Sequence, residues 1–585
     1  MKRNDKLIKK KLYSYLLPSI IMIAALQLGN FVDAIIVGNL LGSYATSAIN
    51  LAVPVIFILQ LPSILFGVGG ATTVSVYLGK RDIEKASGVF SFAIVANLVC
   101  AVGLGLLVLL FEPLLVQLLT GGGAVTELVS PILRVYGVGM PFVCVANCMA
   151  YLMNVDNNPG KMALMHIVSN VINLILDYLL IRYTPVGIAG SALSTVLGYT
   201  LSGAGFIILY AKSNNRMLHF SWKHLKSKAA FMTETVKSGI PSVSLLLMQA
   251  TGSAVINANI LRTLGQDMMA VYAVTVSSMQ ILKMCVEGIV GVIATIAGVL
   301  YGEMDVFGIK KIMKRIIAIV IVVCLALTAF FMAFPGSVAK LYGFSLTELL
   351  PVLNTCLRFF SLSFLVYGLN SIMQNYYRTI GQILPATLTT VLELFLIHVP
   401  VSITAMHVGG VKSMFFCVFF TELATFVTIQ CVRLGRQRAG KMPQKGIFAI
   451  PEENERTFCD ITVEGSIENA VEVSQKLIDY CKDNGIDPKK ATAIGIAAEE
   501  IATNISKYGY KKIKRNFIDI CLSKVDDMLI LRIRDDGAPF NPLDYAKEEK
   551  DKYQITGLEL IKKLSGKLSY TRVLNMNNTV FEIKL

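Results

Sequence analysis

The chain has 585 residues, of which 54% are hydrophobic and only 16% are charged. This composition excludes an ordinary soluble protein and indicates an integral membrane protein. The formal net charge of +15 would also fit a nucleic-acid partner, but the basic residues cluster at the ends of apolar runs. Membrane topology explains that clustering, so we expect a lipid bilayer around the chain and no nucleic-acid binding.

Apolar runs of around 20 residues follow one another from about Leu12 to Val432. A helix of about 20 apolar residues crosses a hydrocarbon layer of about 30 Å, so each run is predicted to be a membrane span. The twelve predicted spans lie near residues 13–38, 50–78, 88–111, 132–153, 162–182, 188–211, 240–262, 269–300, 312–334, 351–376, 384–406 and 413–432.

The basic residues predict the orientation of these spans. If the basic amino terminus is cytoplasmic, the even-numbered connections are cytoplasmic too, whereas the opposite connections carry few basic residues, such as Lys340 and Lys412. Positive residues collect on the cytoplasmic side, so the spans are predicted to cross a bacterial inner membrane with both termini in the cytoplasm. The even-numbered connections contain Lys80, Arg81, Lys85, Lys212, Arg216, Lys223, Lys226, Lys228, Lys310, Lys311, Lys314 and Arg315.

The two halves of this membrane part resemble each other. A constant offset over many positions predicts two like-oriented lobes of six spans, with a substrate path between them near the membrane midplane. A duplicated bundle without transport activity is the alternative. With a shift of 223 residues, the coinciding residues are Pro18–Ser19 with Pro241–Ser242, Gly42 with Gly265, Ala71–Thr72 with Ala294–Thr295, Gly79 with Gly302, and Asp82 with Asp305.

A polar stripe runs along the fifth predicted span. Its members, His166, Asn170, Asn173 and Asp177, recur at steps of four, three and four, which places them on one helical face. A charged side chain at mid-membrane costs about 2.5–3.5 kcal/mol, so Asp177, like Asp33 in the first span, requires compensation by protein, water or an ion. Oxygen ligands suit sodium, and a desolvated aspartate also takes up a proton. Packing of helices through hydrogen bonds is the alternative.

Three segments resemble the multidrug and toxic compound extrusion (MATE) family. They are QLGNFVDAIIVG from Gln27 to Gly38, GVGGATTVSVYLGKRDIEKA from Gly67 to Ala86, and NLILDYLLI from Asn173 to Ile181. The resemblance covers about the first 435 residues. It implies a two-lobed exporter of small organic, cationic or aromatic compounds, driven by inward sodium ions or protons.

The resemblance also implies residue roles. In family members with a cation site in the first lobe, the ligands match Asp33, Asn173, Asp177 and Thr195 of this chain. We therefore expect sodium or proton coupling at these four residues.

The second lobe carries other acidic residues. Lys283 and Glu287 lie four residues apart in the eighth predicted span, where they most simply neutralise each other as an ion pair. Glu287 and Glu393 are candidate substrate-lining residues.

After Lys445 the sequence becomes that of a water-soluble α/β domain. Strand periodicity covers residues 456–463, a helix is predicted over 467–481, and residues 517–522 and 528–533 are predicted to pair as a hairpin. The dipeptide Asp487–Pro488 predicts a further helix start, since aspartate caps and proline fits the first turn. That helix carries Glu500 and Asn504 on one face, and the second hairpin strand ends at Asp535.

Three segments of this domain resemble the GHKL (Bergerat) ATPase fold, and in particular the anti-sigma-factor serine kinases. They are AAEEIATNISKYGY from Ala497, RDDGAPFNP from Arg534, and TGLELIKKL from Thr556. The resemblance implies a Mg-ATP site. In it Asn504 holds magnesium, Glu500 acts as general base, Asp535 accepts the adenine amino proton, Gly537 permits close backbone approach, and Gly557 opens the helix beside the phosphates.

One segment departs from the family pattern. Thr556 and Glu559 stand where the second glycine-rich box normally has glycines. A carboxylate near phosphate is repulsive, so nucleotide binding is better supported than catalysis. The sequence contains no G-x-x-x-x-G-K-[ST] phosphate loop, which argues against a P-loop transport motor.

The predicted fold class is therefore an all-α membrane protein of twelve spans in two six-helix lobes, followed by a soluble α/β sandwich of the GHKL type. The predicted divisions are a first lobe (1–211), a cytoplasmic linker (212–239), a second lobe (240–435), a basic linker (436–455) and an ATP-binding domain (456–585).

We expect a cation-coupled exporter with a cytosolic ATP-binding domain. That domain would regulate the transporter, or act as a serine kinase or ATPase with a protein partner. The alternatives are a lipid-linked precursor flippase and a membrane-tethered serine kinase or sensor.

Overall fold

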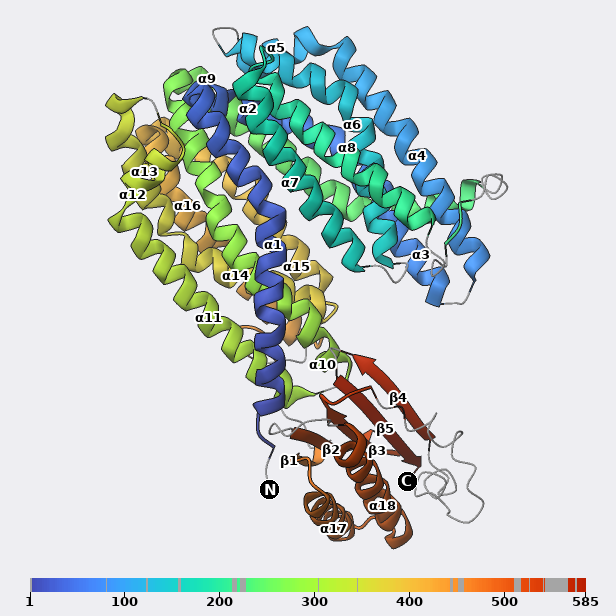
Figure 1. The fold of residues 1–585 in the computed structure, drawn as a ribbon. Helices are drawn as coiled ribbons and strands as arrows, with labels where there is room; N and C mark the ends of the chain where they lie inside the picture. The colour runs from blue at the N-terminus through green and yellow to red at the C-terminus, as the bar shows by residue number, and fades with distance from the viewer. Residues whose placement is uncertain are drawn as a thin grey trace.

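The protein consists of a long helical part and a small sheet domain at one end of it (Figure 1). The computed structural model describes residues 3–79, 82–121, 125–155, 159–212, 218–220, 228–303, 305–344, 346–441, 446–450, 457–509, 517–525, 527–539, 541, 567–573 and 576–584. Gly557 and most of the linker 436–455 that follows Lys441 lie outside the described residues.

The first half of the helical part is built from long helices joined by short connections. These elements are α1 (Lys6–Leu41), α2 (Ser43–Pro62), the π-helical turn η1 (Ser63–Val68), α3 (Gly69–Gly79), α4 (Ile83–Leu110), α5 (Glu112–Thr120), α6 (Thr126–Val155), α7 (Pro159–Tyr183) and α8 (Ala189–Ala211).

The second half repeats this plan with more interruptions. Its elements are α9 (Lys228–Val292), η3 (Ile293–Ala297), α10 (Gly298–Gly302), α11 (Val306–Ala333), α12 (Pro335–Leu341), η4 (Thr347–Leu349), α13 (Leu350–Ser361), α14 (Phe364–Thr379), α15 (Ile383–Val391), η5 (Leu392–Leu396) and α16 (His398–Arg438).

Eight helices of the described residues are long and apolar enough to cross a membrane, or nine if the bent pair Thr347–Ser361 and Phe364–Thr379 is one span. Two of the eight are far longer than one span, and each contains non-helical glycine, at Gly265 in one and at Gly409 and Gly410 in the other. The chain turns at these glycines. Each of the two long helices therefore contains two of the predicted spans, one on either side of the turn.

The sequence repeat is also a repeat of backbone geometry. Gly42 has φ 85° and ψ 179°, and Gly265, 223 residues later, has φ 84° and ψ −179°. Positive φ is readily available only to glycine, so both halves use this residue for the same turn. Asp82 and Asp305 are equivalent helix caps, whose side chains accept from the backbone N–H of Lys85 and Gly308.

One predicted boundary is wrong. The second span was expected to begin near residue 50, but α2 begins at Ser43, directly after the turn at Gly42. This first part of α2 contains three small polar residues, Ser43, Thr46 and Ser47, and all three are buried inside the bundle. A polar helix start buried by its neighbours is invisible to a search for apolar runs.

The sheet domain is a five-stranded antiparallel sheet with two helices. The strand order is β1-β2-β3-β5-β4. The elements are β1 (Thr457–Glu464), α17 (Ile467–Asp483), α18 (Pro488–Asn504), the π-helical turn η6 (Ile505–Gly509), β2 (Phe517–Val525), β3 (Met528–Asp535), β4 (Lys567–Val573) and β5 (Met576–Lys584).

The predicted elements of this domain are confirmed. The strands β2 and β3 pair as the expected hairpin, and the Asp487 side chain caps α18 by accepting from the N–H groups of Lys489 and Lys490. The helices α17 and α18 cover the sheet face that lies away from the helical part (Figure 1). In β3, Leu529, Leu531 and Ile533 are fully buried in the core with these helices.

The other face of the sheet is polar. Because side chains alternate along a strand, Arg532 and Arg534 point away from the core formed by their neighbours in β3. Arg534 is nevertheless 2% exposed, because this face is covered by the amino terminus and by the turn before α11. Figure 1 shows the start of α1 beside β1 and β2.

Candidate functional site

Two aspartates of the membrane helices are held by hydroxyl groups of α8. The Oγ atom of Ser191 donates to Oδ1 of Asp33 at 2.8 Å, which joins α8 to α1. The Oγ atom of Ser194 donates to Oδ1 of Asp177 at 3.1 Å, which joins α8 to α7. One turn of α8 therefore positions two carboxyl groups from two other helices.

An asparagine completes this cluster. The Nδ2 atom of Asn173 donates to Ser194 Oγ at 3.1 Å and to Thr195 Oγ1 at 3.0 Å. Thr195 in turn donates to the backbone oxygen of Ser191. The structure thus brings the four predicted coupling residues together, and we call Asp33, Asn173, Asp177 and Thr195 with Ser191 and Ser194 the acidic cluster.

Two glycines allow the helices of the acidic cluster to approach closely. A Cβ atom at Gly198 of α8 would lie 2.7 Å from the backbone oxygen of Ser169 in α7. A Cβ atom at Gly29 of α1 would lie 2.7 Å from Oδ1 of Asn170, a member of the predicted polar stripe. Small residues at helix crossings let polar side chains of neighbouring membrane helices reach each other.

The acidic cluster contains a buried acceptor to which no described residue donates a hydrogen bond. Asp177 is fully buried, and none of the described residues donates a hydrogen bond to its Oδ2 atom. The carboxyl groups of Asp33 and Asp177 are neighbours in the acidic cluster, because Ser191 and Ser194, which bind them, lie three residues apart on α8. Two adjacent carboxylates in a buried site repel each other, so a shared proton or a small cation is the chemistry that such a pair accommodates.

The acidic residues of the second half form a different arrangement. Glu287 accepts a hydrogen bond from the Tyr367 hydroxyl at 3.2 Å, in place of the expected ion pair with Lys283. The tyrosine approaches from α14, which the i,i+4 spacing does not reveal. Glu393 neighbours Glu422 of α16, and its buried Oε1 atom has no hydrogen-bond partner among the described residues.

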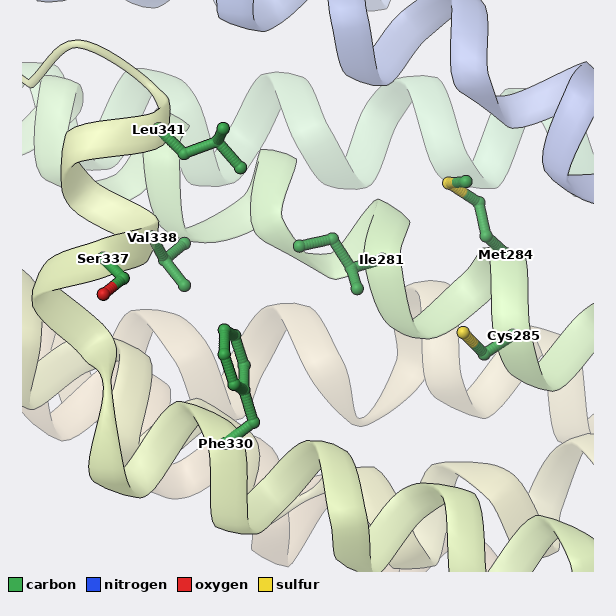
Figure 2. Close-up of a pocket in the computed structure, with 7 residues that line it drawn as sticks. All are labelled: Ile281, Met284, Cys285, Phe330, Ser337, Val338 and Leu341. Atoms are coloured by element: carbon green, nitrogen blue, oxygen red, sulfur yellow. The ribbon is translucent and has the colours of Figure 1, made fainter.

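A cavity of about 440 Å³ lies between α9, α11 and α12 (Figure 2). Phe330, Ile281, Val338 and Leu341 project into the same apolar space in this view. None of the predicted substrate-lining residues contributes to it, so it does not support those assignments. The full lining is Ile281, Met284, Cys285, Phe330, Ser337, Val338 and Leu341.

In the sheet domain, helix α18 presents the predicted magnesium ligand and base together. The Nδ2 atom of Asn504 donates to Oε1 of Glu500 at 2.9 Å. The neighbouring Ala497 and Ile501 are buried against the sheet, while Glu500 and Asn504 are partly exposed beside it. This bond leaves the Asn504 amide oxygen as the hard ligand that magnesium prefers.

Asp535 lies fully buried at the end of β3. Its Oδ1 atom accepts from the N–H of Gly537 at 2.8 Å and from Nδ2 of Asn577 at 2.9 Å, but no residue that the structure describes donates to its buried Oδ2 atom. Burial is the main cause that raises the pKa of Asp535 to about 6, and the charge of Asp536 acts in the same direction. An amino group such as that of adenine would supply the missing donor, so this site fits a nucleotide base.

The sequence did not identify several members of these sites. Ser191 lies three residues before Ser194 and four before Thr195 in α8, a helical spacing that could have identified both serines beside Thr195. Asn577 holds Asp535 only because β5 pairs with β3 in the register that places these two residues opposite each other. No local signal predicts that register.

The model of the MatE family matches residues 18–179 and again residues 241–404. The two matches begin 223 residues apart and together cover more than half of the 585 residues. The chain belongs to the MatE family. The double match also confirms the internal repeat. A second family model, the histidine kinase-like ATPase domain, matches residues 463–582.

This MatE protein is similar to two curated transporters. It is 30% identical over 263 residues to the multidrug export protein MepA of Staphylococcus haemolyticus, covering 45% of this chain and 58% of the relative. It is 29% identical over 299 residues to MepA of Staphylococcus aureus strain NCTC 8325, covering 50% of this chain and 64% of the relative. The matched part of the chain thus spans less than two thirds of the length of these relatives.

The fold of the MatE protein also matches solved structures. An inward-facing multidrug resistance MATE family transporter of the MOP superfamily superposes with a TM-score of 0.62 at 18% identity, covering 72% of this chain and 99% of that chain. An outward-facing structure of such a transporter gives a TM-score of 0.61, also at 18% identity, over 76% of this chain and 100% of that chain. At this identity the match establishes the fold alone.

Proposed function

We propose that this MatE protein is a secondary antiporter that exports small organic compounds, cationic or aromatic in character, in exchange for inward sodium ions or protons. The observation that carries the proposal is the acidic cluster, in which a fully buried carboxylate oxygen of Asp177 accepts from none of the described residues. Uptake and release of one cation there changes the charge inside the bundle, and that change favours different helix arrangements. The names of the Staphylococcus relatives support the substrate class.

The proposed topology has twelve spans in two lobes, residues 1–211 and 240–435, with 212–239 as the linker. It takes α1 as the first span and divides α9 at Gly265 and α16 at Gly409–Gly410, where the backbone is not helical. The lobes lie in a bacterial inner membrane with both termini in the cytoplasm, which the distribution of basic residues supports.

The proposed role of residues 456–585 is to bind Mg-ATP and regulate the transporter. The buried free oxygen of Asp535 supports adenine recognition, and the Asn504–Glu500 pair supports a magnesium ion with an adjacent base. Gly537 and Gly557 are the proposed glycines beside the nucleotide. Glu287 and Glu393 remain proposed substrate-lining residues of the second lobe, where their carboxylates would attract cationic cargo.

The test uses the full chain in proteoliposomes with a fluorescent organic cation as cargo. A sodium or proton gradient is imposed with and without Mg-ATP on the side of the sheet domain. We expect a sodium gradient or a proton gradient to drive export without ATP. Mg-ATP is expected to change the rate of export without replacing the gradient. Export that continues with ATP after every ion gradient has been collapsed would contradict the proposal.

A further inference from the structure

The amino terminus fastens the sheet domain to the helical part. Arg3 forms ion pairs with Asp305, at the start of α11, at 2.6 Å and with Asp460 of β1 at 2.7 Å. The backbone N–H of Arg3 donates to the Asp460 oxygen at 3.1 Å, and that of Asn4 donates to Oγ1 of Thr462 at 3.1 Å. One residue thus contacts both the turn between α10 and α11 and the sheet.

The same turn is held from the sheet side. Arg534 of β3 forms ion pairs with Asp305 and, at 2.8 Å, with Glu303. Nδ2 of Asn578 in β5 also donates to Oε1 of Glu303, at 2.7 Å. A second pair, Asp5 with Arg315 at 2.6 Å, ties the amino-terminal segment to α11 itself.

These contacts are buried rather than superficial. The side chains of Arg3, Asp305 and Arg534 are only 3%, 2% and 3% exposed. Removal of one partner from a buried ion pair leaves an uncompensated charge and is strongly destabilising, whereas exposed pairs contribute little. The sheet domain is therefore docked on the helical part in a defined position by buried ion pairs. A flexible linker alone would not fix that position.

The amino-terminal segment also reaches the nucleotide site. Lys10, in the second turn of α1, pairs with Asp536 at 2.6 Å. Asp536 directly follows Asp535, whose buried Oδ2 atom accepts no hydrogen bond from the described residues. A change at Asp535 is thus one residue away from a contact with α1.

The helix α1 continues from this contact to the acidic cluster. Lys10 and Asp33 belong to the same helix, Lys6–Leu41, and a rise of about 1.5 Å per residue separates them by about 35 Å. Near the middle, the hydroxyl of Ser19 donates to the backbone oxygen of Gly288 in α9 at 2.7 Å. The lower part of α1 is therefore packed on the second half of the molecule, while Asp33 is bonded to the first half.

We propose that residues Arg3–Lys10 form a docking strap that couples the nucleotide site to the acidic cluster through α1, so that occupancy of either site changes the affinity of the other. This inference rests on the proposed function for the identity of the two sites. Coupling free energies are reciprocal, and they typically change an affinity by about 5- to 150-fold.

The test is a double-mutant cycle on the full chain in nanodiscs, read out as the Kd of a fluorescent ATP analogue with magnesium. The substitution Asp33→Asn replaces the carboxylate with a neutral group, so it imitates an occupied cluster without requiring the ion to be known. We expect the Kd to differ at least about fivefold between the wild type and Asp33→Asn. In the Arg3→Ala background the same substitution is expected to leave the Kd unchanged.

A milder variant guards against loss of folding in Arg3→Ala. Lys10 is 56% exposed, so Lys10→Ala should fold and bind nucleotide while reducing the effect of Asp33→Asn. Lys476→Ala is the matched control, because Lys476 also forms a side-chain ion pair, but its partner Glu472 belongs to the same helix, α17. The control is expected to retain the full effect.

The outcomes separate the two proposals. If the nucleotide binds normally and Asp33→Asn changes nothing in the wild-type background, the coupling is refuted and the transport proposal stands. An effect of Asp33→Asn that persists undiminished in both Arg3→Ala and Lys10→Ala refutes the strap as its path. Absence of nucleotide binding to the intact wild-type chain refutes the coupling together with the proposed role of the sheet domain.

Discussion

The hydroxyl of Tyr44 donates to Oδ1 of Asp267 at 2.7 Å, and these two residues are 223 positions apart. This separation is the offset of the internal repeat, so equivalent positions of the two halves bond to each other. Both residues follow the equivalent glycine turns at Gly42 and Gly265. The halves therefore meet near a pseudo-symmetry axis at the end of the bundle that lies away from the sheet domain.

Tyr44→Phe is expected to loosen this contact between the halves. A hydrogen bond contributes about 0.5–1.5 kcal/mol, so the ratio of open to closed molecules at this end should rise about 2- to 10-fold. Distance measurements between spin labels placed at this end of each half would detect the change. Tyr183→Phe is the control, because Tyr183 is 70% exposed at the end of α7. An unchanged distance distribution in Tyr44→Phe would contradict the prediction.

Asp177→Asn is expected to reduce gradient-driven export at least about tenfold, while the protein still folds. The amide keeps the shape and accepts from Ser194, but it cannot exchange a proton and binds a cation more weakly. Transport into proteoliposomes under an imposed gradient measures the loss. Glu112→Gln is a matched control, since Glu112 is another buried carboxylate of the first half, 6% exposed, and pairs with Arg134. Wild-type export in Asp177→Asn would eliminate the acidic cluster as the coupling site.

Nucleotide affinity is expected to fall as the pH decreases through about 6, because burial raises the pKa of Asp535 to about 6. Once protonated, Oδ2 becomes a donor and opposes the adenine amino group. Well below this pKa the Kd should rise by up to about tenfold per pH unit, and above it the Kd should be level. Titration of the full chain with a fluorescent ATP analogue between pH 5 and 7.5 provides the measurement.

The stability of the domain should change in the opposite direction. A carboxyl group whose folded-state pKa is raised is destabilised in its ionised form, so the domain gains stability as the pH falls from about 6 toward 3.8. Asp460, whose pKa burial also raises to about 6, acts in the same direction. Weaker binding at low pH would thus not reflect unfolding. A pH-independent Kd would indicate that Asp535 does not contact the base.

Asn504→Ala and Glu500→Gln are expected to differ in their effects on the nucleotide. Loss of the Asn504 amide should remove the advantage of Mg-ATP over metal-free ATP, since its oxygen is the proposed ligand. Glu500→Gln keeps a group that can face Asn504 and should retain binding while abolishing any phosphate release. Binding with and without magnesium, together with a phosphate assay, separates these results. Equal magnesium dependence in wild type and Asn504→Ala would exclude Asn504 as the ligand.

Phe581→Ala is expected to destabilise the sheet domain by about 3–5 kcal/mol, because this side chain is fully buried in the core beneath α17 and α18. Hydrogen exchange of the β2, β3 and β5 amides in the full chain measures the change. Lys584 is an exposed residue of the same strand, so Lys584→Ala should alter the free energy of unfolding obtained from hydrogen exchange by less than about 0.5 kcal/mol. Similar protection in both variants would refute the assigned core.

The sequence alone determined the class of each part. Apolar runs of membrane length, the constant offset between halves and the strand and helix periodicity of the last 130 or so residues follow from local physical chemistry, because each pattern reflects the solvent that a segment faces. The cap at Asp487, the shared face of Glu500 and Asn504, and the strand end at Asp535 were also local and were confirmed.

Only the tertiary structure decided which residues meet across helices and strands. Ser191 and Ser194 reach the two aspartates because glycines let α8 and α1 approach α7. The partner of Glu287 is Tyr367 from another helix, and not the nearby Lys283. The burial of Arg3 between Asp305 and Asp460 joins residues about 300 and 460 positions apart. Contacts of this length depend on how the whole chain folds back on itself, so no local pattern encodes them.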